Sequence, residues 1–420
     1  MPWSRKPLVT GAAACSLLLY VLPAQLRPGN FPTDDAYFYL QVADHIQAGH
    51  GSTFIAITLT NGYHPLWMAF CVAVLRLGGG DRDRVLHAVL GLQQFSFLLI
   101  VWLFYRLARG LGLRSWFVAV PILAFGFLAT AMYAVEAFVN GLTVVASLYF
   151  LAAAQREPRD RNWTLLGFAL GSSFLARLDN IFLVASLAGG GTAAAGPSGR
   201  QRLRRLLLTL SPLALLALPY LVSNQLLFGH LLPISGRIKT RFPHAGLHFD
   251  TLGAIGVVVG SAALVALAYT WCRPVDTRVR LTLRATAAGV LLHGIYVLLF
   301  VHDNTLTWSY VPGIVHLALF VAVIAGDLRA ALVRWRWAHH MPGLALGATL
   351  ALLALGSLRA WVDFWNPDAA GLNLLQFRRA ARTKWQNDVT PAREPGRGPP
   401  RGLSTPSLAG GPFSFTADTS

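Results

Sequence analysis

The chain has 420 residues, of which 55% are hydrophobic and only 13% are charged. A soluble protein of this composition could not cover its surface with polar groups, so the composition indicates an integral membrane protein. The formal net charge is +17, a value that also occurs in nucleic-acid-binding proteins. Here, however, the basic residues form short arginine clusters between long apolar runs, which is the pattern of cytoplasmic loops and excludes nucleic acid as a partner.

The N-terminal segment predicts a retained transmembrane helix. Arg5 and Lys6 precede the apolar run Leu8–Leu26, which is long and is followed by no small-x-small cleavage site, so a signal peptide is the less favoured interpretation. Cysteine spacing predicts neither a disulfide framework nor a zinc site, because no CxxC or Cys/His pattern occurs. The cysteines are Cys15, Cys71 and Cys272.

A first outer segment over residues 27–84 should begin with an amphipathic helix that lies on the membrane. Apolar residues recur at helical spacing between positions 36 and 46, Thr33 or Asp34 can cap the helix start, and glycines at 49 and 51 can end it. This places Asp34 and Asp35 at the positive end of the helix dipole, where the ionised carboxylate is favoured.

The next apolar run, Pro65–Leu77, is only about a dozen residues long, so its length fits an interfacial helix better than a membrane span. The arginine clusters test this choice. If the run does not cross and the N-terminus is cytoplasmic, every arginine-rich loop lies on the cytoplasmic side. If it did cross, each of these loops would face outward, against the positive-inside rule.

The remaining apolar runs are long enough to cross a hydrocarbon core of roughly 30 Å. Together with the first helix they predict an all-α polytopic membrane protein of about 11 transmembrane helices. The later spans are expected at Val85–Tyr105, Trp116–Tyr133, Ala137–Ala154, Thr164–Ala176, Ile181–Ala195, Leu206–Phe228, Leu252–Trp271, Leu281–Val301, Tyr310–Ala325 and Leu344–Trp361.

This topology gives one transmembrane domain over residues 1–362 and an outer tail over 363–420. The tail becomes rich in Pro, Gly and Ser, so most of it is expected to be disordered.

Polar groups with catalytic potential fall on the outer side of this topology, although they come from five separate segments. Chance placement would divide them between the two faces, whereas a site at the membrane surface would gather them on one. They are Asp34, Asp35, His64, Glu136, Asp179, Lys239, His302 and Asp303.

The stretch from Asp34 to Trp67, which contains TNGYHPLW, closely resembles the first outer loop of bacterial GT-C glycosyltransferases of the mannosyltransferase and aminoarabinose-transferase type. Later segments agree in order and on the same face: AMYAVEAFVNGL, FLARLDNIF and SNQLLFGHLLPISGRIKT. The motif around Asn61 and Tyr63 is the most specific piece. The resemblance covers the membrane part, to about Trp361.

The resemblance implies a multi-pass enzyme of the bacterial inner membrane whose active site faces the periplasm. It would move a sugar, with inversion, from a polyprenyl-phosphate carrier to an acceptor glycan, glycolipid or protein, in contact with membrane lipids. Asp34 matches the first acid of the family pair and is the candidate base, while Asp35 holds the helix start or the sugar. Lys239, with Arg237 beside it, is the candidate partner of the lipid phosphate.

Each of the other candidates also has a structural interpretation. His64 either donates to a phosphate or holds the loop. Glu136 lies at the outer edge of two spans, where an unpaired carboxylate is costly, so a partner or a polar cavity is expected. Arg177 and Asp179 are expected to pair across a tight turn, and His302 belongs to another outer turn together with Asp303. No metal constellation is visible, and a divalent cation held by Asp34, Asp35 and Glu136 is left open.

Two alternatives remain beside the transferase. A transporter or flippase would bind a lipid-linked sugar without cleaving it. Midplane charges or paired broken helices in two repeated halves would indicate this function. An inactive remnant is the other, because GT-C proteins commonly carry a longer C-terminal portion than the low-complexity tail here.

Overall fold

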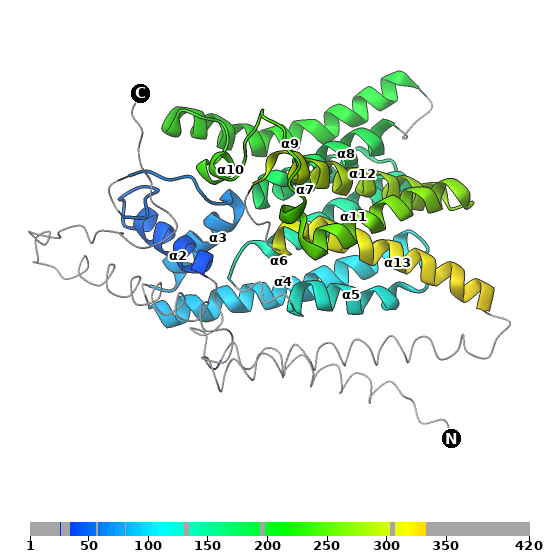
Figure 1. The fold of residues 1–420 in the computed structure, drawn as a ribbon, viewed down its shortest axis with the longest axis horizontal. Coiled ribbons are helices and arrows are strands. Elements are labelled where there is room, and N and C mark those ends of the chain that lie inside the picture. Colours follow the sequence, from blue (N-terminus) through cyan, green and yellow to red (C-terminus); the bar gives the residue numbers. More distant parts are fainter. Residues whose placement is uncertain are drawn as a thin grey trace, which may run out of the picture.

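The computed structural model describes residue 26 and residues 34–55, 58–79, 81–129, 134–193, 198–302 and 307–332. The described residues form helices and connecting turns and contain no β-strand; two isolated bridges, Thr53 with Leu59 and Thr240 with Val301, are the only strand-like pairings among them. The predicted all-α class is thus confirmed. Figure 1 shows most of the helices running side by side as a bundle, with α2, α3 and α10 gathered at one end of it.

Six helices of the described part are long and apolar enough to cross a membrane. They are α4 (Arg82–Gly110), α6 (Ala137–Arg156), α9 (Gly199–Phe228), α11 (Phe249–Cys272), α12 (Thr277–Phe300) and α13 (Val311–Leu332). Two shorter helices, α7 (Asp160–Ala176) and α8 (Ile181–Ala193), pack within the same bundle. The length and apolar character of these helices indicate a membrane protein.

The predicted count of about 11 spans is not confirmed. The first and last predicted spans, Leu8–Leu26 and Leu344–Trp361, lie outside the described residues apart from Leu26, as does the tail. The expected span Trp116–Tyr133 is not one continuous helix, and its last four residues also lie outside the described part. It consists of a 3-10 turn (η2, Trp116–Ala119), α5 (Val120–Ala124) and a π-helical turn (η3, Phe125–Ala129). Pro121 lacks an amide hydrogen, so it belongs in the first turn of a helix and not in the middle of one.

Close helix packing depends on glycine at a few positions. A Cβ atom on Gly167 of α7 would collide with the backbone carbonyl of Thr209 on α9. Likewise, a Cβ on Gly289 of α12 would lie 2.7 Å from the Cα of Leu183 on α8. Small residues that let backbones approach are typical of helix contacts inside membranes, where van der Waals packing holds helices together.

Helices α2 (Asp34–Gln47) and α3 (Pro65–Leu77) form a unit at one end of the bundle. Two residues with positive φ, Gly49 (81°) and Gly51 (78°), follow α2, as the sequence predicts. The apolar stripe of α2 does not face outward: Leu40 is 1% exposed and packs in one cluster with Trp67 of α3. Its apolar residues therefore contact protein, which leaves the predicted membrane-lying role of α2 unsupported.

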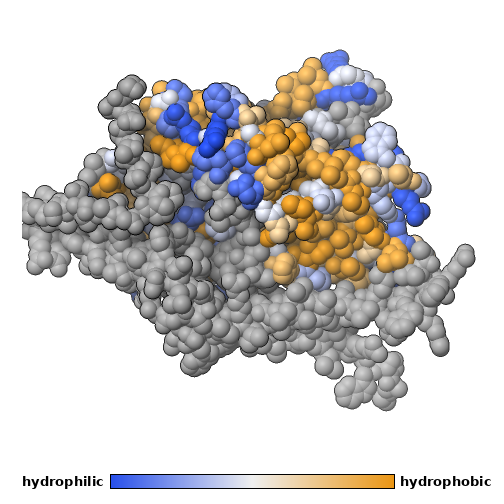
Figure 2. Space-filling view, in the orientation of Figure 1, coloured by the Kyte–Doolittle hydropathy of each residue, from blue (hydrophilic) through white to orange (hydrophobic). Residues whose placement is uncertain are grey.

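The two ends of the bundle differ in charge pattern. At the end opposite α2, arginine side chains meet the helix termini: Arg204 pairs with Asp160, and Arg205 lies 5.6 Å from the ring centroid of Trp163. Between the ends, the coloured part of the surface in Figure 2 is largely apolar, and its hydrophilic residues gather toward the two ends. This distribution fits helices that cross a lipid bilayer.

Candidate functional site

A buried carboxylate organises the end of the bundle next to α2. Glu136 precedes the first residue of α6 and is 2% exposed. Its Oε1 lies 2.5 Å from Nη1 of Arg177, and its Oε2 accepts a hydrogen bond of 3.3 Å from the hydroxyl of Tyr39. A buried carboxylate is strongly unfavourable unless it is paired and hydrogen-bonded. The partner expected for Glu136 is therefore present.

Arg177 joins Glu136 to a second carboxylate. It follows the last residue of α7, and its Nε and Nη2 donate to the two oxygens of Asp179 at 3.0 and 2.7 Å. The pairing that the sequence predicts is thus confirmed, and it has the two-pronged geometry that a guanidinium favours. Nη2 also donates to the hydroxyl of Ser309, and Nε2 of His293 lies 3.5 Å from Asp179 Oδ2.

These contacts fix the charge states of the cluster. Burial would raise the pKa of Asp179, but the charge of Arg177 and the contact with His293 outweigh it and hold this pKa well below its usual value. Burial, and next the charge of Glu136, raise the pKa of the Tyr39 hydroxyl, so that it stays protonated and donates. We call Tyr39, Glu136, Arg177, Asp179 and His293 the buried polar network.

His64 lies against this network from the loop before α3. Its Nε2 is 3.5 Å from Glu136 Oε1, and its backbone amide donates to the Tyr39 hydroxyl at 3.1 Å. Burial lowers the pKa of His64, although the charge of Glu136 opposes the shift, so the ring is neutral at pH 7. Its Nδ1 is buried and has no hydrogen-bond partner in the described part of the chain, which leaves one ring nitrogen for a water or a substrate group.

The same loop is attached to α10 (Ile234–Lys239). The side-chain oxygen of Asn61 accepts a hydrogen bond of 2.9 Å from the backbone amide of Ile234, while its Nδ2 is buried and meets no partner among the residues that the structure describes. Tyr63 turns toward its own loop, with its hydroxyl 2.8 Å from that of Ser52. The motif that carries the sequence resemblance therefore links the segment before α3 to the segment after α9.

Arg237 and Lys239 are exposed on α10. The backbone amide of His302 donates to the carbonyl of Lys239 at 3.2 Å, so this segment is also tied to the end of α12. The His302 side chain is exposed. The positive charge of Lys239 also contributes to lowering the pKa of His64. The cations of α10 thus lie on the same end of the bundle as the network.

The acidic pair stands at the start of α2. Asp34 is the first residue of the helix, as expected, but its side chain lies outside the described part. The side chain of Asp35 is exposed. Its negative charge adds slightly to the rise in the pKa of Tyr39. Asp303 lies outside the described residues.

Known proteins give no identification of this site. No family model, curated protein or solved structure matches the chain. Its chemistry has to be argued from the geometry above and from the sequence resemblance.

The described residues contain no group of three or more His, Cys, Asp or Glu side chains that could hold a metal ion. Glu136 has its oxygens directed at Arg177 and Tyr39, so it is poorly placed to serve as a cation ligand. With Glu136 engaged in this way, a divalent-cation site would depend on Asp34 and Asp35, and such a site stays a prediction.

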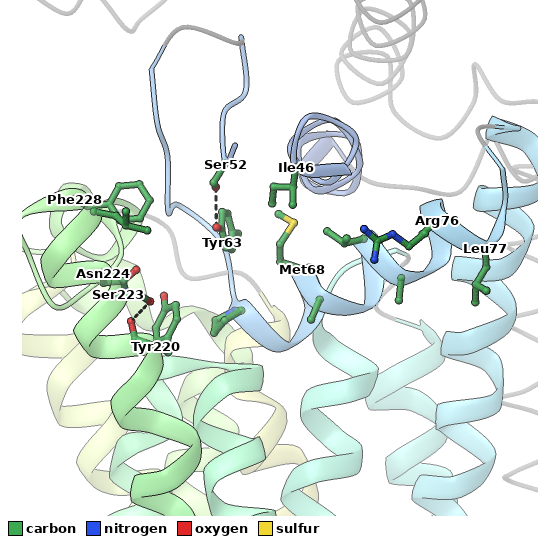
Figure 3. A pocket seen from close by; sticks show the side chains of 15 residues that line it. Ile46, Ser52, Tyr63, Met68, Arg76, Leu77, Tyr220, Ser223, Asn224 and Phe228 are labelled. Carbon is green, nitrogen blue, oxygen red and sulfur yellow. Dashed lines mark hydrogen bonds between the residues drawn. The ribbon is translucent and has the colours of Figure 1, made fainter. Parts of the chain in front are cut away.

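An apolar groove of about 670 Å³ lies beside the loop, between α3 and the second half of α9 (Figure 3). We call it the α3–α9 groove. Apolar side chains and two alanines of α3 form much of its lining, and Arg76 is the one charged residue in it. Its residues are Ile46, Ser52, Tyr63, Pro65, Met68, Ala69, Val72, Ala73, Arg76, Leu77, Tyr220, Ser223, Asn224, Leu227 and Phe228.

Three network partners are absent from the sequence-based candidates. Tyr39 fits the apolar stripe of α2, and only the structure shows its hydroxyl on Glu136. His293 lies within an apolar span, where an ionisable residue is by itself a signal of function. Ser309 gives no signal in the sequence, because nothing local marks a serine that meets an arginine 132 residues away.

Proposed function

We propose that this chain is a membrane glycosyltransferase that moves a sugar from a lipid-phosphate carrier to an acceptor hydroxyl. The reaction would occur at the end of the bundle that holds the buried polar network. The observation that carries the proposal is the meeting of groups from the α2, α6, α7 and α12 segments with the loop before α3, which is hydrogen-bonded to the α10 segment that carries Arg237 and Lys239. Long-range gathering of costly polar groups is typical of a functional site.

The proposed chemistry needs a base, a cationic partner for the leaving group and a fixed frame. Asp34, by its match to the resembled family, takes the proton of the acceptor hydroxyl. The hydroxyl oxygen then forms a bond to the anomeric carbon while the bond from that carbon to the phosphate oxygen breaks, with inversion. Arg237 and Lys239 stabilise the negative charge that the departing lipid phosphate keeps.

The buried polar network supplies the frame. Glu136 and Asp179 are both engaged by Arg177, so neither is available as a free base. Tyr39 connects this pair to the backbone of His64. We assign these residues a positioning role: they hold the start of α2 and the loop around His64 in a fixed relation.

We also propose the orientation. Because the arginine clusters lie at the opposite end of the bundle, the positive-inside rule places that end in the cytoplasm and the network end outside, at the periplasmic face of a bacterial inner membrane.

Transport of a lipid-linked sugar is the second candidate. It is favoured by irregular helices: α11 is interrupted at Gly253, with φ 58° and ψ 173°, and α9 contains Pro212 and Pro219. Against it, the charged residues Glu136, Arg177 and Asp179 lie at helix ends and not at the middle of a span, although His293 of the network lies inside α12.

Mass spectrometry of envelope lipids from cells with and without the gene separates the two candidates and the inactive remnant. The transferase predicts that one sugar disappears from a defined acceptor without the gene and also in Asp34→Asn cells that express the protein normally, with Asp81→Asn as an acidic control from the same loop region. Accumulated sugar-loaded carrier beside unchanged acceptor would favour transport, and identical lipid profiles in all strains would contradict the proposal.

A further inference from the structure

The α3–α9 groove has the properties of a site for a lipid chain. Its wall on α3 extends from Pro65 to Leu77, about 18 Å at helical rise. Ala69 and Ala73 are four residues apart on one face of that helix and leave the space that larger side chains would fill. The opposite wall, on α9, ends in Leu227 and Phe228.

Apart from the Tyr220 hydroxyl, which is buried and has no hydrogen-bond partner among the described residues, the polar side chains beside α9 and the loop are satisfied within the protein. The Ser52 hydroxyl bonds to the carbonyl of Thr60, and the Ser223 hydroxyl to that of Tyr220. The Asn224 amide donates to the carbonyl of Leu231. A ligand with many polar groups along its length would find few partners here, whereas a hydrocarbon chain needs none.

Arg76 is different. It lies in the last turn of α3, its side chain is exposed, and it makes no hydrogen bond or ion pair with any residue of the described part of the chain. Figure 3 shows it at the end of the groove away from Tyr63 and Tyr220. A guanidinium with its donors unused beside an apolar groove is complementary to an anionic head joined to an apolar chain.

We propose that the α3–α9 groove binds one phospholipid, with an acyl chain between α3 and α9 and its phosphate on Arg76. This goes beyond the proposed function, because the phosphate on Arg76 lies at the far end of the groove from the loop that carries His64. The lipid is therefore neither donor nor acceptor of the sugar. It joins α3 to α9 by filling the space between them.

Photo-crosslinking tests the proposal on the purified full chain in phosphatidylcholine vesicles. The probes are phosphatidic acid and diacylglycerol that carry the same diazirine-labelled acyl chain. Phosphatidic acid should label the peptides that contain residues 65–77 and 220–228. Arg76→Gln should reduce this labelling about tenfold, as expected for the loss of one charge-assisted contact, without changing the weaker labelling by diacylglycerol.

Two further variants separate this site from ordinary lipid around the bundle. Ala73→Trp should fill the groove and remove the labelling, whereas Leu215→Trp, at a 65% exposed position of α9 outside the groove, should leave it unchanged. Arg84→Gln is the matched loss of a neighbouring exposed cation and should also have no effect. Equal labelling by both probes, or labelling that survives Ala73→Trp, would overturn the proposal whether or not sugar transfer is found.

Discussion

One guanidinium pairs with a buried and a partly buried carboxylate at the end of the bundle next to α2. Arg177 contacts Glu136 and Asp179 at once, and its side chain is only 8% exposed. Removing one member of a buried ionic cluster leaves the others uncompensated in a medium that solvates them poorly. Loss of Arg177 should therefore destabilise the fold.

Arg177→Gln should lower the free energy of unfolding by about 3–5 kcal/mol, because the buried carboxylate of Glu136 and the partly buried one of Asp179 lose their partner. Thermal unfolding in detergent measures the change as a fall in Tm. The control is Arg84→Gln, which removes an exposed pair with Asp81 at 3.1 Å and should cost at most about 1 kcal/mol. Similar Tm values for the two variants would show that the network does not stabilise the fold.

His64 gives a pH dependence. Burial holds its pKa below the ordinary value of 6.5, so the unfolded chain takes up a proton at a higher pH than the folded chain. Stability from this residue is complete above pH 6.5 and is lost as the pH falls toward the folded pKa. The Tm difference between wild type and His64→Asn should therefore shrink below pH 6.5. A difference that stays constant or grows between pH 8 and pH 5 would contradict the burial of a neutral ring.

Among the helices, the sequence predicts bounds best where a local pattern of residues determines where a helix begins and ends. Helix α3 has the predicted bounds Pro65–Leu77, because proline begins it and three glycines follow it. The expected span Trp116–Tyr133 was wrong as a continuous helix, since hydropathy alone does not register Pro121 or the π-helical turn that follows. Apolar length was thus a better guide to helix existence than to helix continuity.

The candidate site shows the same limit. The pairing of Arg177 with Asp179 spans two residues and could be predicted. The contact of Tyr39 with Glu136 joins residues 97 apart, and its hydroxyl is hidden in an apolar stripe. Contacts of that kind are set by how the helices pack, which no single segment encodes.

Helix packing itself is testable at Gly167. Gly167→Ala places a methyl group against the backbone of α9 and should cost about 1–3 kcal/mol, because neither helix can move without disturbing its other contacts. The same change at Gly260 of α11, where an added Cβ would meet nothing within 4 Å, should be neutral or stabilise the helix by about 0.5–1 kcal/mol. Equal Tm values for the two variants would refute the close approach of α7 and α9.

For the whole molecule, the difference between the two ends of the bundle leads to an orientation. Single cysteines at positions 84 and 159, in a chain whose three native cysteines are replaced by serine, should react differently with a membrane-impermeant maleimide in intact spheroplasts. The cysteine at 84 should be labelled from outside, and the one at 159 only after lysis. The opposite result would place the network in the cytoplasm and remove the proposed periplasmic reaction.

The proposed function requires the network end of the bundle to bind the phosphate of a lipid-linked sugar through the cations of α10. Binding of a short-chain polyprenyl phosphate to protein in nanodiscs, measured for wild type, Lys239→Ala and the exposed-cation control Arg84→Gln, tests it directly. We expect Lys239→Ala to raise the Kd about tenfold or more, because one charge-assisted contact is lost. The Kd of Arg84→Gln should equal that of the wild type. An unchanged Kd for Lys239→Ala, or an equal rise in both variants, would contradict it.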